Sequence, residues 1–151
     1  MMRWARGEAI IERLIDDRRL QKVSGAQADG AALLARAHRT VETARMIATD
    51  DPDSAYVLAY DAMRQACTAL LAHQGLRPTT QGGHYAVEEA VRAQFGDAFR
   101  AVGTLRRRRN ELEYPAYPGD EAEPDEAVEA IRLAQGIIES AERILPNLSI
   151  F

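Results

Sequence analysis

Residues 51–75 read DPDSAYVLAYDAMRQACTALLAHQG, and they predict one long helix with clear signals at both ends. Asp51 is suited to cap the first turn, and Pro52 suits the first helical position because proline lacks an N–H that would otherwise be unpaired there. Apolar side chains then recur at helical spacing on one face, which comprises Tyr56, Tyr60, Met63, Cys67, Leu70 and Leu71. Gly75 is placed to end the helix.

The rest of the chain repeats this organisation, with helical periodicity interrupted by short loops that contain glycine or proline. Alanine, leucine, arginine and glutamate dominate and favour helix, and we find no convincing period-two pattern of a strand. The expected helices span about 3–21, 26–49, 51–74, 84–95, 98–114 and 124–145, with loops at 76–83 and 116–123. We therefore expect a single all-α domain over residues 1–151. It would be an antiparallel bundle of four core helices plus a short helix and an N-terminal helix.

The 151-residue chain contains no run of about 18 apolar residues, and no long apolar stretch follows its N-terminus. We therefore expect a cytoplasmic protein with neither a signal peptide nor a membrane association. Cys67 is the only cysteine, which excludes an internal disulfide and a zinc site built from cysteines. Its three histidines are too scattered to indicate a metal site. We expect no metal and no cofactor.

Arginine provides 18 of the 19 basic residues, and Lys22 is the only lysine. A GC-rich genome would favour arginine and alanine codons, and we expect this to explain most of the bias. The formal net charge of −4 argues against a domain that coats DNA with positive charge. Binding of nucleic acid depends, however, on where the charges cluster.

Residues 106–115 read RRRRNELEYP and are the most unusual stretch of the chain. On a helix with about 100° per residue, the four arginines are not equivalent. Arg109 falls in the middle of the apolar stripe, which consists of Phe99, Val102, Leu105 and Leu112. Arg106 and Glu113 flank that stripe, and Asn110 and Tyr114 lie further round. The helical phase points Arg107 and Arg108 away, into solvent.

Two interpretations of this stretch follow from its chemistry. In the structural one, Arg109 pairs with Glu113 four residues later, because a buried guanidinium is costly without a partner. In the functional one, Arg106, Arg109 and Asn110 donate hydrogen bonds to a phosphate, which suits the bidentate geometry of guanidinium groups. The acidic loop that follows, with Asp120, Glu121 and Glu123, either screens the arginines or pairs with them.

Two segments resemble the HEPN domain, a small all-α domain of prokaryotic defence and toxin–antitoxin proteins. Residues 59–71, continued by 75–79 and Gly83-His84, are similar to the second core helix of that family and the loop after it. Residues 107–115 are similar to the end of its third core helix. With the last helix, the resemblance covers about residues 30–145 and looks closest to an actinobacterial-type branch.

The resemblance implies a homodimer that brings two motifs together and, in nuclease members, RNA cleavage without metal. Those members carry an arginine, often followed by asparagine, with a histidine about five residues after the arginine. Arg109 and Asn110 match the first two positions, whereas Tyr114 stands at the histidine position with Glu113 beside it. Imidazole titrates near neutrality and can serve as acid or base, whereas tyrosine has an unperturbed pKa near 10.

The sequence therefore favours a dimeric HEPN-like module that binds RNA or a protein partner without catalysis. The alternative from the enzyme class is a metal-independent endoribonuclease, such as a toxin, in which Arg109 holds the phosphate and Tyr114, Glu113 or His84 moves protons. A third alternative is a dimeric scaffold without a role on nucleic acid, in which the Arg109–Glu113 pair is purely structural. A nucleotidyltransferase-like partner is a further expectation, with Tyr114 or Tyr117 as the modified residue.

Three smaller predictions concern side chains outside the motif. His84 either caps the helix that it begins or faces the Arg106–Asn110 region, where it joins the phosphate-binding set. Arg64 is expected to pair with Asp61 or with the acidic loop. The N-terminal helix is expected to serve dimer contacts through Trp4, Ile11 and Ile15.

Overall fold

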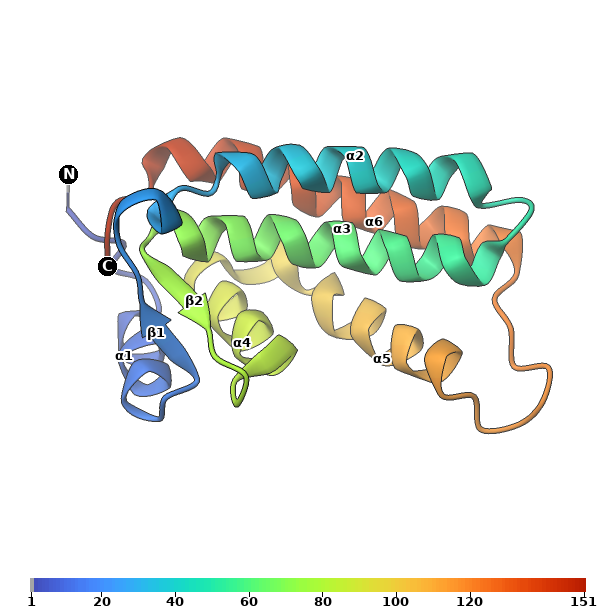
Figure 1. Cartoon of the computed structure of the whole chain (residues 1–151), viewed down its shortest axis with the longest axis horizontal. Helices are drawn as coiled ribbons and strands as arrows, with labels where there is room; N and C mark the ends of the chain where they lie inside the picture. The colour runs from blue at the N-terminus through green and yellow to red at the C-terminus, as the bar shows by residue number, and fades with distance from the viewer. Residues whose placement is uncertain (1) are drawn as a thin grey trace.

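The structure is a computed structural model that describes residues 2–151, and within that range it is a helical bundle with one very short sheet (Figure 1). The helices are α1 (Glu8–Asp16), α2 (Ala31–Ile47), α3 (Pro52–His73), α4 (Gly83–Phe95), α5 (Ala101–Glu113) and α6 (Pro124–Ile144). The strands are β1 (Leu20–Lys22) and β2 (Leu76–Pro78), and the short 3-10 helices are η1 (Gly25–Ala28), η2 (Gly96–Phe99) and η3 (Leu145–Asn147). The predicted all-α class is confirmed.

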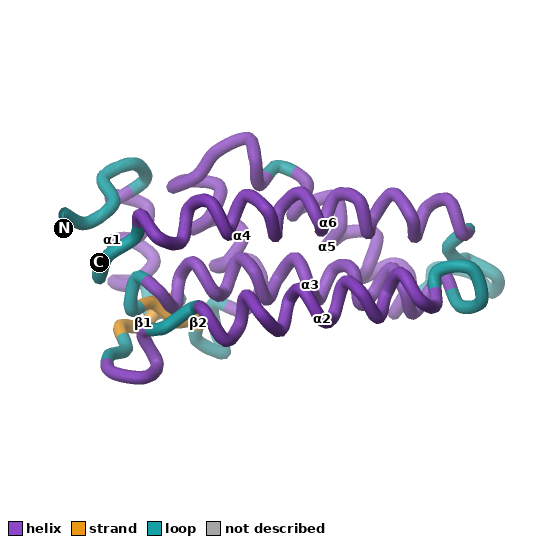
Figure 2. Tube along the Cα trace, turned by 90° about the horizontal axis from the view of Figure 1, so that it is seen from above, coloured by secondary structure: helices purple, strands orange, loops and turns teal. Residues whose placement is uncertain are grey.

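Helix α3 forms the centre of the bundle and begins as its sequence predicts. The Asp51 side chain accepts a hydrogen bond from the backbone N–H of Ser54 at 3.2 Å, and Pro52 occupies the first turn. The long helices α2, α3 and α6 run side by side, as the view from above shows (Figure 2). Helices α4 and α5 pack against another side of α3 (Figure 1).

The core extends almost all the way around α3. Every side chain of its predicted apolar face is buried, and so are the alanines between them, which are Ala55, Ala59, Ala62, Ala66 and Ala69. A helix that is buried on all sides needs small residues where neighbouring helices approach closely. The alanine-rich sequence of α3 meets that need, because α2, α4, α5 and α6 all pack against it.

The N-terminal helix is shorter than the predicted 3–21 at both ends, since α1 begins at Glu8 and ends at Asp16 and residues 20–22 form strand β1. The next helix begins at Ala31 rather than at 26, because residues 25–28 form the 3-10 helix η1. Arg18 adopts a left-handed backbone conformation with φ of 61°, which turns the chain out of the helix. Strand β1 pairs antiparallel with β2, so that Leu20 lies opposite Pro78 and Lys22 opposite Leu76. The prediction that residues 76–78 belong to a loop is therefore also wrong. Three-residue strands are too short to show a period-two pattern.

Helix α1 docks on α4 of its own chain. The indole N–H of Trp4 donates to the carbonyl of Gln94 at 2.9 Å, and the Trp4 ring contacts the edge of Phe95 with centroids 5.2 Å apart. Ile11 is fully buried and Ile15 packs against the core. The expectation that Ile11 serves dimer contacts is wrong, because its side chain is used inside the protomer.

No helix in the described part of the chain is both long and apolar enough to cross a membrane.

Candidate anion-binding site

The four consecutive arginines of α5 lie in four different environments. The Arg106 Nε donates to Glu88 of α4 at 2.7 Å, and both side chains are largely buried. Arg107 is exposed, as its helical phase predicts. Arg109 pairs with Glu113 at 3.5 Å, which confirms the predicted ion pair. Gly103 permits the close approach of α5 to α4, since a Cβ there would lie 2.6 Å from the Glu88 carboxylate.

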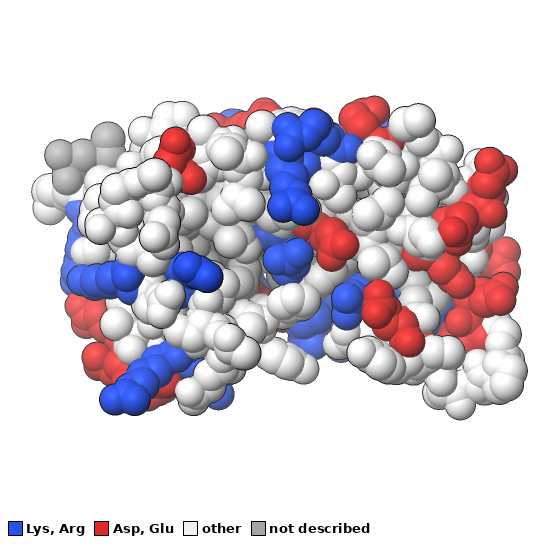
Figure 3. Space-filling model, in the orientation of Figure 1, with Lys and Arg blue, Asp and Glu red and all other residues white. Residues whose placement is uncertain are grey.

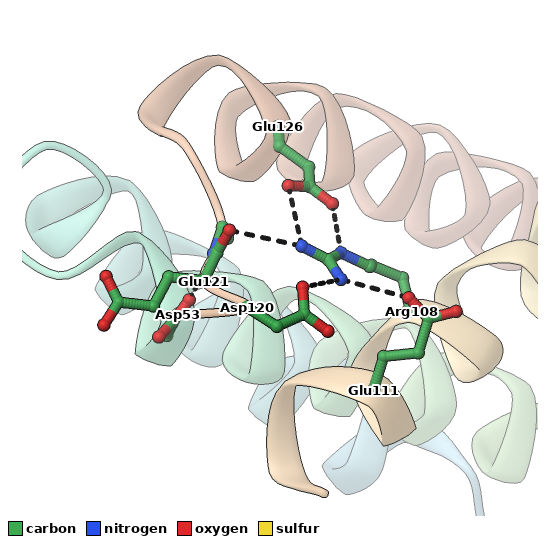
Figure 4. A network of polar contacts seen from close by, with 7 residues as sticks. Asp53, Arg108, Glu111, Asp120, Glu121 and Glu126 are labelled. Atoms are coloured by element: carbon green, nitrogen blue, oxygen red, sulfur yellow. Dashed lines mark hydrogen bonds and ion pairs between the residues drawn. The ribbon is translucent and has the colours of Figure 1, made fainter. Parts of the chain in front are cut away.

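Arg108 is the exception to the predicted pattern, because it does not point into solvent. Its side chain is only 20% exposed and lies within a group of acidic residues (Figure 4). Its guanidinium pairs with Glu126 and donates to Asp120 and Glu111, each at 3.0 Å, and it also reaches the backbone carbonyl of Glu121. The hydrogen bond with Glu126 is the largest of the effects that raise the pKa of Arg108.

These contacts show whether the acidic loop screens the arginines of α5 or pairs with them. Asp120 and the Glu121 carbonyl of this loop, with Glu126 of α6, bind Arg108, and the loop forms no ion pair with the other arginines of α5 among residues 2–151. The Asp53 carboxylate of α3 accepts from the backbone N–H of Ala122 at 2.5 Å and fixes the same loop from the other side. Arg108 is therefore a structural residue that stabilises the loop between α5 and α6.

His84 faces the arginines and does not cap its helix. Gly82 is the N-cap of α4 and makes no side-chain cap, whereas His84 Nδ1 shares a 2.7 Å hydrogen bond with the hydroxyl of Tyr60 on α3. The pKa of His84 is lowered, first by burial of part of the ring and then by the positive charges of Arg64, Arg109 and Arg106, against which Asp61 acts. The ring is nevertheless exposed and can reach a ligand.

Arg64 of α3 completes the cluster, although its neighbours in the sequence predict another role. Neither Asp61 nor the acidic loop forms an ion pair with it among residues 2–151, although Asp61 lies near enough to act on His84. The Arg64 Nε is buried without an acceptor, and the Arg109 Nε is in the same condition. Arg64 follows Tyr60 by one helical turn, so it lies beside the hydroxyl that holds His84.

We call this set the arginine–histidine cluster, and define it as Tyr60, Arg64, His84, Arg106 and Arg109. It draws on three helices, with Tyr60 and Arg64 from α3, His84 from α4 and the remaining two from α5. The Arg109 guanidinium carbon lies 5.7 Å from the centre of the Tyr60 ring. Basic side chains gather at the middle of the face where these helices meet (Figure 3).

Comparison with known proteins places this architecture in a family. The family model of the HEPN domain matches residues 31–144, which include α2 to α6 and therefore every member of the cluster. The chain belongs to the HEPN family. It has no significant match among curated proteins or among solved structures.

Within the HEPN domain, Tyr60 is the hydrogen-bond partner of His84. Burial raises the pKa of Tyr60 to about 12, although the nearby Arg64, Arg109 and Arg106 act in the opposite direction. Tyr60 therefore keeps its proton at neutral pH and can donate it to Nδ1 of a neutral His84. In that arrangement the His84 proton lies on Nε2, as a donor for a ligand.

The remaining predicted site residues lie at the end of α5 and away from His84. Asn110 is exposed, and its amide oxygen accepts a 3.4 Å hydrogen bond from Arg109. Tyr114 caps the helix C-terminus through its backbone N–H, which donates to the Asn110 carbonyl at 2.9 Å. Its side chain is 78% exposed and has no hydrogen bond to any residue from 2 to 151. Glu113 is held by Arg109. The structure thus brings Arg106, Arg109 and His84 together but leaves Tyr114 in solvent.

The cluster has the character of an anion site rather than a metal site. Its charged members are three guanidinium groups, which repel metal cations. In the described range, no group of three or more histidine, cysteine or acidic residues is arranged to hold a metal ion. Guanidinium groups with unpaired N–H donors suit an oxyanion with several acceptor oxygens.

Proposed function

We propose that this HEPN domain binds RNA, with one phosphate held by the arginine–histidine cluster, and that it does so without cleaving the strand. The observation that carries the proposal is the pair of buried Nε groups on Arg64 and Arg109, which lack acceptors inside the protein. An unpaired buried donor destabilises a fold unless a ligand or water satisfies it. A phosphate offers acceptors to both guanidinium groups and to Nε2 of His84.

Charge balance in the cluster supports an anionic ligand. Arg109 has one carboxylate partner at 3.5 Å, and Arg106 shares Glu88 with Arg92, whose guanidinium lies 3.6 Å from that carboxylate. Arg64 has no ion pair among residues 2–151. The cluster therefore holds more positive charge than its neighbours neutralise.

The proposal is tested by measuring the anisotropy of a fluorescently labelled single-stranded RNA as protein is added. We expect Arg109→Ala and Arg64→Ala each to weaken binding at least tenfold. Arg132→Ala, which removes an exposed arginine from α6, is the matched control and keeps wild-type affinity. If the wild-type protein binds no RNA, the proposed function is wrong and the structural interpretation of the Arg109–Glu113 pair is favoured.

A second candidate is a metal-independent endoribonuclease, and the position of His84 is the observation that favours it. The HEPN motif of this chain has no histidine of its own, but His84 approaches Arg109 from α4. In the other tautomer, with Nδ1–H donating to the Tyr60 oxygen, a neutral His84 would take the proton of a ribose 2′-hydroxyl at Nε2, and the 2′-oxygen would then form a bond to phosphorus. The bond from phosphorus to the 5′-oxygen would break, and that oxygen would leave with a proton from a solvent water, whose hydroxide takes the proton back from the His84 imidazolium. The products are a 2′,3′-cyclic phosphate and a 5′-hydroxyl.

This second candidate is tested by incubating RNA with the protein in EDTA and analysing the ends of any fragments. Cyclic-phosphate ends that disappear in both His84→Ala and Arg109→Ala would support the enzyme. Intact RNA under conditions where the wild type binds it supports the non-catalytic module instead.

Homodimerisation and a nucleotidyltransferase-like partner are further proposals that rest on the HEPN relationship. The side chains of Tyr114 and Tyr117 are 78% and 61% exposed, so both hydroxyls are accessible to a modifying enzyme. Sedimentation of the purified protein tests the dimer, and the intact mass after co-expression with such a partner tests the modification. If the Tyr114→Phe/Tyr117→Phe double variant shows no increase in mass after the same co-expression, these two tyrosines are the modified residues.

A further inference from the structure

An open groove of about 950 Å³ is lined by residues of α1, α4 and η2 and by Arg106 of α5. Its carboxylates are Glu88, Glu89 and Asp97, and it contains twice as many guanidinium groups, from Arg6, Arg13, Arg19, Arg92, Arg100 and Arg106. The groove is therefore strongly basic in a chain whose net charge is −4. We call it the α1–α4 groove.

Half of these arginines have no acidic partner. Arg13 pairs with Glu89, whereas Arg92 and Arg106 share Glu88. Arg6, Arg19 and Arg100 are exposed and form no ion pair with any residue in the range 2–151. These three come from separate segments, before α1, before β1 and between η2 and α5.

The Arg6 side chain lies against the groove wall at Gly96. A Cβ on Gly96 would lie 2.5 Å from a terminal nitrogen of Arg6, so the guanidinium occupies the space that any other residue at position 96 would fill. Gly96 also has a φ of 72°, which favours glycine. The local backbone thus leaves room for this cationic group on the surface of the groove.

Tyr85 supplies an aromatic surface at the boundary between the groove and the arginine–histidine cluster. Its side chain is 62% exposed, and the Arg106 guanidinium carbon lies 4.3 Å from the ring centre. Glu88 holds Arg106 in place through the 2.7 Å contact, so the Tyr85 ring rests on a fixed support. Arg106 belongs to both the groove and the cluster, which makes the two sites contiguous.

We propose that the α1–α4 groove binds the single-stranded continuation of an RNA whose phosphate lies in the cluster, with one base stacked on Tyr85. This inference rests on the proposed function and adds a second contact region to it. Basic grooves that follow a backbone, combined with exposed aromatic rings, are the usual means of binding single strands. A duplex does not fit this requirement, because its bases are already paired and stacked.

The extent of the groove argues against a single small anion as its ligand. One phosphate cannot satisfy three unpaired arginines from three segments together with an aromatic platform. Several successive nucleotides can do so.

The test compares competition by a uridine dinucleotide and by an eight-nucleotide oligouridine. For the wild type we expect the longer strand to bind at least tenfold more tightly. The variant Arg6→Gln/Arg19→Gln/Arg100→Gln should lose this gain but still bind the dinucleotide. The slope of log affinity against log salt should fall by about 2, at about 0.7 for each single-strand phosphate that the variant no longer neutralises. Tyr85→Ala should weaken binding of the longer strand about tenfold, and Tyr85→Trp should retain it.

A control variant, Arg36→Gln/Arg39→Gln/Arg132→Gln, makes the same change in net charge with exposed arginines of α2 and α6, outside the groove. It should bind both strands as the wild type does. Length dependence that survives the groove substitutions, or equal binding of a matched RNA duplex, would overturn the groove assignment. If Arg109→Ala still abolishes binding in that case, the proposed function stands. If neither strand binds the wild type, the proposed function fails first.

Discussion

At the scale of single residues, the environment of each arginine in the 106–109 run follows from what lies opposite its position on α5. Arg106 meets Glu88 of α4, Arg108 meets the acidic loop, and Arg109 meets Glu113 and the Tyr60 ring. Helical phase predicts the direction of each side chain from its own helix. It does not predict which element covers that direction, and for this reason the phase of Arg108 wrongly indicates solvent.

The pKa of His84 is a measurable probe of the cluster, because it is lowered by burial and by three arginines. We expect an NMR titration of its ring protons to give a pKa below 6.5. Arg64→Ala should raise that pKa, because one nearby positive charge is removed. Inorganic phosphate or an RNA dinucleotide should raise it as well, since an anion stabilises the imidazolium. A His84 pKa that does not respond to either ligand would contradict anion binding at the cluster.

The same shift predicts how His84 affects stability. Its folded-state pKa lies below its unfolded value, so the unfolded chain binds more protons between these two values. The contribution of His84 to stability is therefore fully present above about pH 6.5 and decreases as the pH falls through the folded-state pKa. Urea unfolding of the wild type and of His84→Gln at several pH values measures this difference. The prediction is wrong if acidification raises the free energy of unfolding of the wild type relative to that of His84→Gln.

At the scale of elements, Arg108 connects α5, α6 and the loop between them, and its removal should affect stability rather than binding. Arg108→Met leaves Asp120 and Glu126 without their main cation, and we expect a loss of about 1–3 kcal/mol in the free energy of unfolding. The neighbouring Arg107→Met, at an exposed position, should stay within about 0.5 kcal/mol of the wild type. Equal effects of the two substitutions on a urea denaturation curve would refute a structural role for Arg108.

The helices and strands also show which parts of the fold can be predicted from the sequence alone. Helices α2 to α6 were predictable because their apolar periodicity, Asp51 cap and proline boundaries are local signals. Strands β1 and β2 were not, because each has three residues and their pairing joins parts of the chain more than fifty residues apart. The role of Arg64 was unpredictable for a related reason. Asp61 is its nearest acidic neighbour in sequence, but the contacts that make Arg64 part of a site come from α4 and α5.

At the scale of the whole molecule, the α1–α4 groove lies partly outside the HEPN match, because α1 and β1 precede residue 31. The N-terminal segment contributes Arg6, Arg13 and Arg19 to a groove whose other side belongs to α4 and η2. The groove therefore depends on docking of this segment against the bundle. Trp4 is the main side chain in that docking, through its hydrogen bond to Gln94 and its contact with Phe95.

Trp4 substitutions should consequently separate the two binding regions. We expect Trp4→Ala to lower the free energy of unfolding by about 2 kcal/mol, because the ring is only partly buried, and to remove the tighter binding of long over short RNA. Trp4→Phe keeps the aromatic contact but loses the N–H, so it should cost about 1 kcal/mol and retain the length dependence. Binding of the dinucleotide should be unchanged in both, since the cluster lies on α3, α4 and α5. A Trp4→Ala protein that remains folded and still prefers the longer strand would show that the docked N-terminal segment makes no contribution to RNA binding.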